Sequence, residues 1–142
     1  MDNIMDNTVV RITKRFTFEA CHNLVNYEGP CHRLHGHSYK LYVTVRRFIN
    51  PNSGMVMDFK TLKSIVNTHV IDKVDHQNLN EIMPEEFQMS SKDNTTCENM
   101  LVAFWVALDH SLLSEGVTLD KLKLYETEDS YAEIDRRDIY NG

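Results

Sequence analysis

Alternation of hydrophobic and polar residues dominates two long stretches in the first third of the chain. Residues 9–22 place aromatic and small side chains and one histidine on a common face: Phe16, Phe18, Ala20 and His22. The same alternation returns over residues 35–49, where one face collects His35, His37, Tyr39, Leu41, Val43 and Val45. Such a period of two is typical of strands with one buried face. Residues 23–34, with asparagine, glycine and proline, predict the connecting loop.

Helical spacing replaces this alternation after a turn at residues 50–54. Asp58 is a plausible N-cap, and apolar residues then recur at helical intervals, which predicts a helix over about 59–73. Residues 74–94 carry polar clusters and Pro84, and we expect them to be irregular.

A second helix is indicated by the pair Thr95 and Glu98, which fits a capping box with Thr95 as the cap. Apolar residues at helical spacing follow, and Gly116 ends this helix. Alternation resumes at residues 119–127, and a tight turn leads to a last strand at 131–135. One face of the first of these strands collects Leu122, Leu124 and Glu126.

The order strand, strand, helix, helix, strand, strand contains no alternation of strands and helices. It therefore predicts an α+β fold, with an antiparallel four-stranded sheet and two helices, rather than a doubly wound one. We expect residues 1–8 to be a flexible N-terminus and residues 9–142 to form a single domain. A small sheet leaves exposed edges that invite pairing with another subunit, so we expect a homo-oligomer.

Composition narrows the class of protein. The net charge is −6, which argues against a nucleic-acid binder, because phosphate backbones are held by clusters of lysine and arginine. No apolar run approaches the roughly 18 residues of a membrane span. The three cysteines form no disulfide framework, and we expect free thiols in the reducing cytoplasm.

A metal site is suggested by His35 and His37. Two apart on a strand, they point to the same side at about 7 Å between Cα atoms. Gly36 between them admits close approach of another group. A loop that returns the chain antiparallel would place His22 beside them, and three histidines with an open fourth position are typical of catalytic zinc. The alternative is three unrelated histidines near strand ends.

Several other residues have the chemistry of a catalytic site. Cys31 lies in the loop that leads to His35, close to Arg33, and spacing leaves open whether its thiol is a metal ligand or a base. Asp75 and His76 are a candidate acid/base pair or simply a polar loop pair. Glu126 shares a face with leucines, so its carboxylate needs a partner, for which an amine-bearing heterocycle is suited. The alternative is that Glu126 lies at an exposed strand end.

The remaining histidines and cysteines are expected to have no chemical role. Because side chains alternate along a strand, Cys21 should lie on the face opposite His22. The side chain of Cys97 is expected to pack in the first turn of the second helix. His32 is interpreted as a solvated loop residue, and His69 and His110 as structural.

Six ordered motifs together resemble one known family. FTFEACH, CHRLHGHSYKL, GMVMDF, VDHQNLN, TTCEN and LYETED are similar to the corresponding segments of 6-pyruvoyl-tetrahydropterin synthases and of the related QueD enzymes. The resemblance implies the tunnelling fold (T-fold). It also implies subunits joined as trimers whose sheets close a barrel, stacked in pairs as a hexamer, with active sites between subunits.

The resemblance further implies a zinc-dependent lyase that binds one zinc ion per subunit and acts on 7,8-dihydroneopterin triphosphate. The resemblance implies that the zinc ligands are His22, His35 and His37 and that Cys31 is the proton acceptor. It implies that Asp75 and His76 form a proton relay. Glu126 would anchor the pterin ring, helped by Thr96 and the main chain near Cys97.

The spacing between the cysteine and the histidine pair separates branches of this family. Cys31 lies only four residues before His35, in the compact form C-x-R-L-H-G-H. This form resembles QueD, 6-carboxy-5,6,7,8-tetrahydropterin synthase, which releases acetaldehyde and serves queuosine biosynthesis. The alternatives are a 6-pyruvoyl-tetrahydropterin synthase, which eliminates triphosphate without cleaving the side chain, and a non-catalytic pterin- or zinc-binding module.

Overall fold

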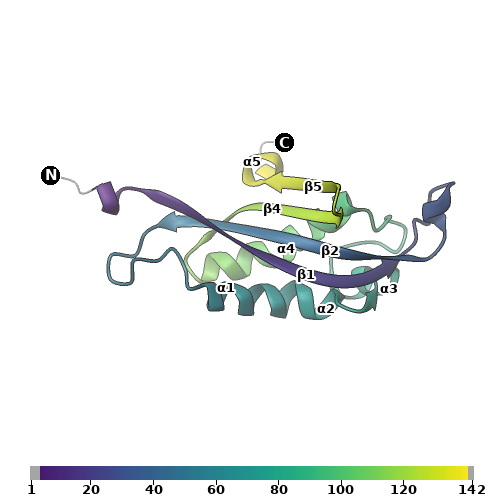
Figure 1. The fold of residues 1–142 in the computed structure, drawn as a ribbon, viewed down its shortest axis with the longest axis horizontal. Coiled ribbons are helices and arrows are strands. Elements are labelled where there is room, and N and C mark those ends of the chain that lie inside the picture. Colours follow the sequence, from purple (N-terminus) through teal and green to yellow (C-terminus); the bar gives the residue numbers. More distant parts are fainter. Residues whose placement is uncertain (1–3, 141–142) are drawn as a thin grey trace.

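The computed structural model describes residues 4–140, so part of the expected flexible N-terminus, residues 1–3, lies outside it. A twisted sheet forms one layer and helices cover one of its faces (Figure 1). The sheet and helices together confirm the predicted α+β class. No helix in this described part of the chain is both long and apolar enough to cross a membrane.

The sheet has the strand order β3-β1-β2-β4-β5. The predicted strands are present as β1 (Val9–His22), β2 (His35–Phe48), β4 (Thr118–Thr127) and β5 (Ser130–Asp135), and consecutive members of this set pair antiparallel. A fifth strand, β3 (Gln77–Asn78), runs parallel to β1. The prediction of a four-stranded, purely antiparallel sheet was therefore wrong, because two residues outside any alternating run pair with the β1 edge.

The predicted first helix is a continuous helical segment that begins after Asp58. It comprises α1 (Phe59–Val66), a π-helical turn η3 (Asn67–Ile71) and α2 (Asp72–Val74). The Asp58 side chain accepts a hydrogen bond from Lys60 N–H at 2.8 Å, which confirms the N-cap.

The prediction that residues 74–94 are irregular was wrong. They include β3 and a helix, α3 (Leu79–Glu86), and Asn78 caps this helix by accepting a hydrogen bond from Asn80 N–H. Pro84 lies near its C-terminal end, where the missing N–H removes only a late hydrogen bond. Leu79 and Met83 are buried in the core, so tertiary packing stabilises a helix that the local pattern does not indicate.

The second predicted helix is α4 (Cys97–Ser114), but its cap differs by one residue from the prediction. Thr96, not Thr95, is the N-cap, and its hydroxyl oxygen accepts a hydrogen bond from Asn99 N–H at 3.2 Å. Thr95 is instead buried and bonded to His22. The capping-box pattern favoured Thr95, because Glu98 follows it by three residues, whereas Thr96 is followed at that distance by Asn99. The tertiary contact with His22 overrides this local preference.

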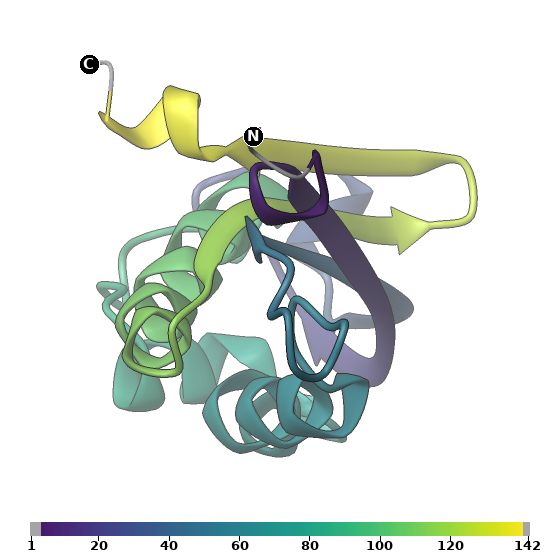
Figure 2. The ribbon, with the colours of Figure 1, turned by 90° about the vertical axis from the view of Figure 1, so that its left-hand side faces the viewer.

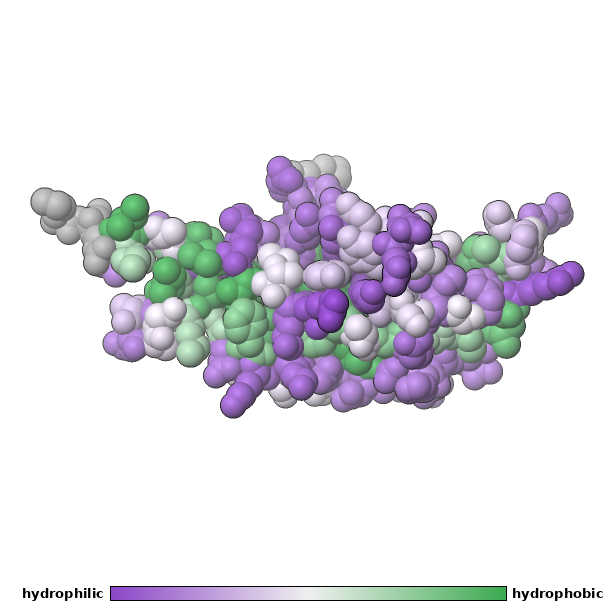
Figure 3. Space-filling model, in the orientation of Figure 1, coloured by the Kyte–Doolittle hydropathy of each residue, from purple (hydrophilic) through white to green (hydrophobic). Residues whose placement is uncertain are grey.

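The end view shows the helices on one side of the sheet (Figure 2), and most of the buried core residues belong to these two layers. Phe18, Tyr39 and Phe104 are buried there, and Phe18 stacks on Tyr39 with 4.8 Å between ring centroids. Apolar side chains also gather on the surface where β1 begins and β2 ends (Figure 3), including the exposed Val9 and Phe48.

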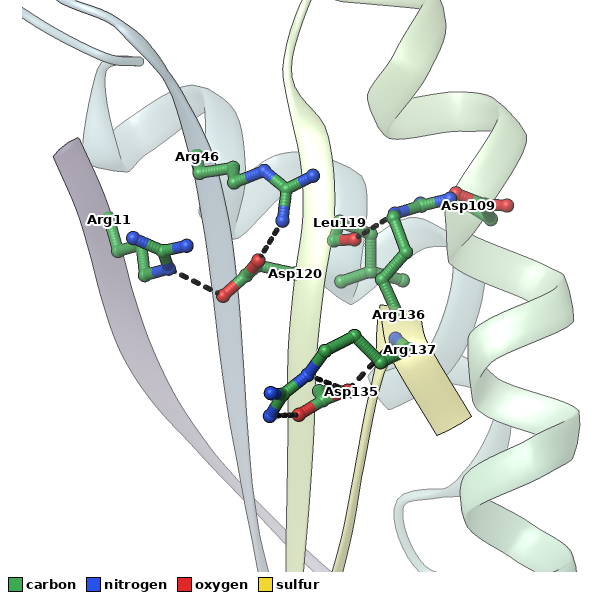
Figure 4. Close-up of polar contacts among 8 residues, drawn as sticks. All are labelled: Arg11, Arg46, Asp109, Leu119, Asp120, Asp135, Arg136 and Arg137. Carbon is green, nitrogen blue, oxygen red and sulfur yellow. Dashed lines mark hydrogen bonds and ion pairs between the residues drawn. The ribbon is translucent and has the colours of Figure 1, made fainter. Parts of the chain in front are cut away.

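Arginine–aspartate pairs join the strands and helices at that same end of the sheet (Figure 4). Asp120 on β4 pairs with Arg11 on β1 and with Arg46 on β2. Arg136, which begins α5 (Arg136–Tyr140), donates to Asp109 of α4 and to the carbonyl of Leu119. These contacts tie three strands and two helices together, far along β1 and β2 from the histidines.

Candidate metal centre

Strand register brings the three predicted ligands together. In the antiparallel β1–β2 pair, His22 lies directly opposite His35, and His37 lies opposite Ala20. Because alternate residues share a face, all three rings occupy the helix-covered side. One nitrogen of each ring lies within 4.8 Å of the corresponding nitrogens of the other two, a spacing from which a metal ion can be held.

Main-chain acceptors fix which nitrogens face the centre. His22 Nδ1 donates to the carbonyl of Thr95 at 2.7 Å, with the Thr95 hydroxyl at 3.1 Å. His35 Nδ1 donates to the carbonyl of Arg33 at 2.7 Å. Donation through Nδ1 leaves the Nε2 lone pair of each ring available, as in metal-binding histidines.

The Nε2 atoms of His22 and His37 are buried and have no hydrogen-bond partner among the described residues. A buried polar atom left unsatisfied is costly unless a ligand completes it. A divalent cation accepts both lone pairs at once, so the donor set fits a metal ion that prefers nitrogen ligands.

The electrostatics of the cluster favour neutral, metal-binding imidazoles. Burial lowers the pKa of His22 and of His37 below the ordinary histidine value, and this is the largest influence on each. The neighbouring carboxylate of Glu126 acts in the opposite direction, with Oε1 at 3.5 Å from His22 Nε2 and 3.4 Å from His37 Nε2. One nearby negative charge also favours a bound cation.

Glu126 connects the cluster to a neighbouring cavity. It lies near the end of β4, and with Cys97 and Glu98 at the start of α4 and Ser130, Tyr131 and Ala132 of β5 it lines a cavity of about 350 Å³. Cys97 is buried, its thiol donates to the Leu124 carbonyl at 3.2 Å, and burial raises the pKa of this thiol to about 12. Its side chain therefore packs, as predicted, and a ligand in the cavity would meet Glu126 as the principal charged group from the sheet.

Asp75 and His76 lie at the β1 edge. Asp75 Oδ1 accepts a hydrogen bond from Glu19 N–H at 2.9 Å, and His76 N–H donates to the Glu19 carbonyl at 2.6 Å. His76 Nε2 lies 3.7 Å from Asp75 Oδ1, and His76 has a φ of 60°, which is rare outside glycine. Its exposed ring lines a cavity of about 440 Å³ between β3, β1 and β2, together with Cys21 and Ser38.

Cys31 lies in the loop between β1 and β2, within the 3₁₀ turn η2 (Pro30–His32). Its side chain is half-buried, and its carbonyl accepts a hydrogen bond from Leu24 N–H at 2.8 Å. In the described part of the chain, no hydrogen bond joins its thiol to Asp75 or His76. A single chain therefore assembles the histidines with Glu126, but does not join Cys31 to the Asp75–His76 pair.

Sequence reasoning did not find two residues that surround the histidines. Thr95 orients His22, but its position in a Thr-Thr pair suggested only a helix cap. Tyr39 is completely buried beneath the rings, 5.5 Å from the centroid of His37, and its hydroxyl has no partner among the described residues. Its place on the same face as His37 was visible in the alternation, although that pattern also suits any core residue.

The chain resembles known pterin synthases over nearly its whole length. A family model described as 6-pyruvoyl tetrahydropterin synthase matches residues 11–137. The 6-pyruvoyl tetrahydrobiopterin synthase of Dictyostelium discoideum is 32% identical over 148 residues, covering 97% of this chain and 99% of that protein. The 6-carboxy-5,6,7,8-tetrahydropterin synthase of Haemophilus influenzae is 31% identical over 139 residues, covering 87% and 96%.

A solved structure agrees with these sequence matches. The 6-pyruvoyl tetrahydropterin synthase of Caenorhabditis elegans superposes with a TM-score of 0.78 at 26% identity, over 90% of this chain and 96% of that one. Relatives of nearly equal identity carry the names of two different pterin synthases. The match over residues 11–137, the shared fold and the histidine cluster lead to one conclusion: the chain belongs to the 6-pyruvoyl tetrahydropterin synthase family.

Proposed function

We propose that this protein is a zinc-dependent 6-carboxy-5,6,7,8-tetrahydropterin synthase of the queuosine type. It would convert 7,8-dihydroneopterin triphosphate and one water into 6-carboxytetrahydropterin, acetaldehyde and triphosphate. The observation that carries the choice of product is the short connection between Cys31 and His35. A single 3₁₀ turn holds Cys31, and the main-chain carbonyl of Arg33 in the same connection accepts the hydrogen bond that orients His35.

His22, His35 and His37 would hold one zinc ion per chain through their Nε2 atoms. When bound, zinc supplies Lewis acidity to the hydroxyl groups of the substrate side chain. The Cys31 thiolate would accept the proton removed from the carbon beside those hydroxyls. The Asp75 carboxylate would orient His76, which exchanges the second proton.

The pterin ring would lie in the cavity beside Glu126. A carboxylate can accept two parallel hydrogen bonds from the amine and ring N–H groups of such a heterocycle. Thr96 and the main chain of Cys97 lie at the start of α4, next to this cavity. The Thr96 oxygen accepts the capping hydrogen bond, so its hydroxyl hydrogen stays available as a donor to the ligand.

The complete active site would form between subunits of a homo-oligomer, with a hexamer of two stacked trimers as the proposed state. Two observations support association. Among the described residues β5 pairs only with β4, and the outer edge of β1 is covered only where β3 pairs with Ala20 and Cys21. Unpaired edges of this kind favour strand pairing with another copy. The Asp75–His76 pair of one subunit would then serve the Cys31 of another.

Product analysis tests this function directly. Purified protein containing zinc is incubated with 7,8-dihydroneopterin triphosphate, the pterin product is identified by mass, and acetaldehyde is trapped and quantified. We expect 6-carboxytetrahydropterin and an equal amount of acetaldehyde. A 6-pyruvoyl product without acetaldehyde would assign the protein to the pyruvoyl branch. Tight pterin binding without any conversion would support a non-catalytic module.

A further inference from the structure

The side chain of Asn80 is bonded to the main chain of Asn23, the residue that follows β1. Asn80 Oδ1 accepts a hydrogen bond from Asn23 N–H at 2.9 Å, and Asn80 Nδ2 donates to the Asn23 carbonyl at 2.9 Å. The partners fix the orientation of this amide, because the N–H can only donate and the carbonyl can only accept. One side chain thus satisfies both polar groups of a loop residue.

This contact continues the strand pairing beyond its last main-chain partner. Strand β3 pairs Gln77 with Ala20 and Asn78 with Cys21, and the chain then turns into α3, which lies beside the C-terminal part of β1 (Figure 1). A carboxamide carries the same donor and acceptor as a peptide group. The Asn80 side chain therefore replaces the peptide group that the turn into α3 removes from the β1 edge.

The bonded segment leads directly to Cys31. Leu24 follows Asn23, and its N–H donates to the Cys31 carbonyl at 2.8 Å. The outer part of the same loop has a separate attachment, in which Asn26 bonds to the side chain of Asn94 and to the carbonyl of Lys92. The Asn80 side chain therefore holds the residue directly before Leu24, whose N–H bonds to Cys31. On its other side, Asn23 follows His22, a candidate metal ligand.

We propose that Asn80 is a positioning residue that holds the Cys31 loop in place relative to the histidine cluster. The proposal rests on the proposed function in so far as Cys31 acts as the base. Asparagine suits the position for a chemical reason. Aspartate has no donor for the Asn23 carbonyl and turns negative charge toward it, alanine offers neither group, and glutamine is one methylene longer.

The test compares Asn80→Ala and Asn80→Asp with the control Asn50→Ala. Asn50 Oδ1 accepts hydrogen bonds from Asn52 and Ser53 in the turn at the opposite end of β2, so its loss also removes two local hydrogen bonds. The cap of α3 uses the main-chain N–H of Asn80, which both variants retain. For the Asn80 variants we expect kcat to fall roughly tenfold to 100-fold, with zinc content and KM unchanged. The control should keep wild-type kcat.

Amide hydrogen exchange gives a readout that does not depend on turnover. We expect faster exchange at Leu24 in both Asn80 variants, faster exchange at Asn23 in Asn80→Ala, which removes the acceptor for that N–H, and unchanged exchange in α4. Asn50→Ala should leave Asn23 and Leu24 protected. Continued protection of Leu24 in Asn80→Ala would overturn the proposal, as would unchanged kcat or a fall in kcat matched by loss of zinc. If the wild-type protein converts no pterin, the proposed function fails, and exchange at Leu24 alone decides whether Asn80 holds the loop.

Discussion

The histidine cluster and the Cys31 loop are adjacent in sequence but are held by different kinds of structure. His22, His35 and His37 lie on two strands that pair without interruption along the whole length of β1. Cys31 lies in a loop whose attachments to the rest of the fold come mainly from asparagine side chains. The comparison shows that a metal site can be fixed by strand register while the group expected to act beside it depends on a few side-chain contacts.

The difference has a direct physical basis. A shift of the β1–β2 register by one residue would turn every buried side chain of the strand toward solvent, so the core fixes the position of the histidines. No comparable set of buried contacts holds residues 23–34, none of which is fully buried, and Val25 and Tyr27 are exposed. Changes to the cluster and changes to the loop should therefore have separable effects.

Of these changes, His37→Ala should have the largest effect, because it alters the histidine cluster itself. Removing one of three ligands should lower the zinc content from about one ion per chain to nearly none and abolish turnover. The fold should persist, because the His37 side chain is partly exposed and is not among the buried core residues. Metal analysis of the purified variant measures the outcome. His110→Ala, on the exposed side of α4, is the control, and full zinc content in His37→Ala would remove this residue from the ligand set.

Cys31→Ala should affect the function of the loop without affecting metal binding by the histidine cluster. Zinc content should stay at the wild-type level, while kcat should fall by about 10²- to 10⁴-fold, the usual contribution of a general base. His32→Ala, the exposed neighbour in the same turn, should keep both values. Parallel metal analysis and steady-state kinetics give the result. Loss of zinc together with activity would instead identify the Cys31 thiol as a metal ligand.

Thr95→Val and Thr96→Val form a matched pair that tests the support of the cluster. Thr95→Val removes the hydroxyl near His22 Nδ1 but keeps the carbonyl acceptor, so zinc affinity should fall by up to about tenfold. Thr96→Val removes the cap of α4 and should lower the free energy of unfolding by about 1 kcal/mol without changing zinc affinity. Zinc competition with a chelator and denaturant unfolding separate the two. Equal zinc affinities would contradict the role of the Thr95 hydroxyl.

The smallest expected effect concerns the Cys97 thiol at alkaline pH. Burial raises its pKa to about 12, above the value of about 8.5 expected in the unfolded chain. The stability that this difference contributes is complete below pH ~8.5 and is lost as the pH rises toward the folded value, at about 1 kcal/mol per pH unit. Unfolding midpoints between pH 8 and 9 should therefore fall slightly more in the wild-type protein than in Cys97→Ala. Alkylation of Cys97 in the native protein at pH 9, measured by peptide mass, would contradict this burial.

The sequence by itself determined the long strands, the two principal helices and the side of the sheet on which the histidines lie. Alternation fixed the shared face of Phe18 and His22 on one strand and of His37 and Tyr39 on the other, because side chains on a strand alternate regardless of what the strand pairs with. The spacing of His35 and His37 therefore indicated a metal site before any pairing was known. The ordered motifs likewise predicted the family to which the chain belongs.

Only the tertiary structure decided what depends on contacts between distant segments. Residues 77–86 become β3 and α3 because the β1 edge and the core accept them, although their local pattern is irregular. Thr95 turns to His22 and leaves the cap of α4 to Thr96, although the local capping-box pattern favours Thr95. Asn80 meets Asn23 across 57 positions of sequence, and no local pattern encodes such a contact. Local periodicity placed the candidate ligands, while long-range packing and hydrogen bonding decided what holds the surrounding residues in position.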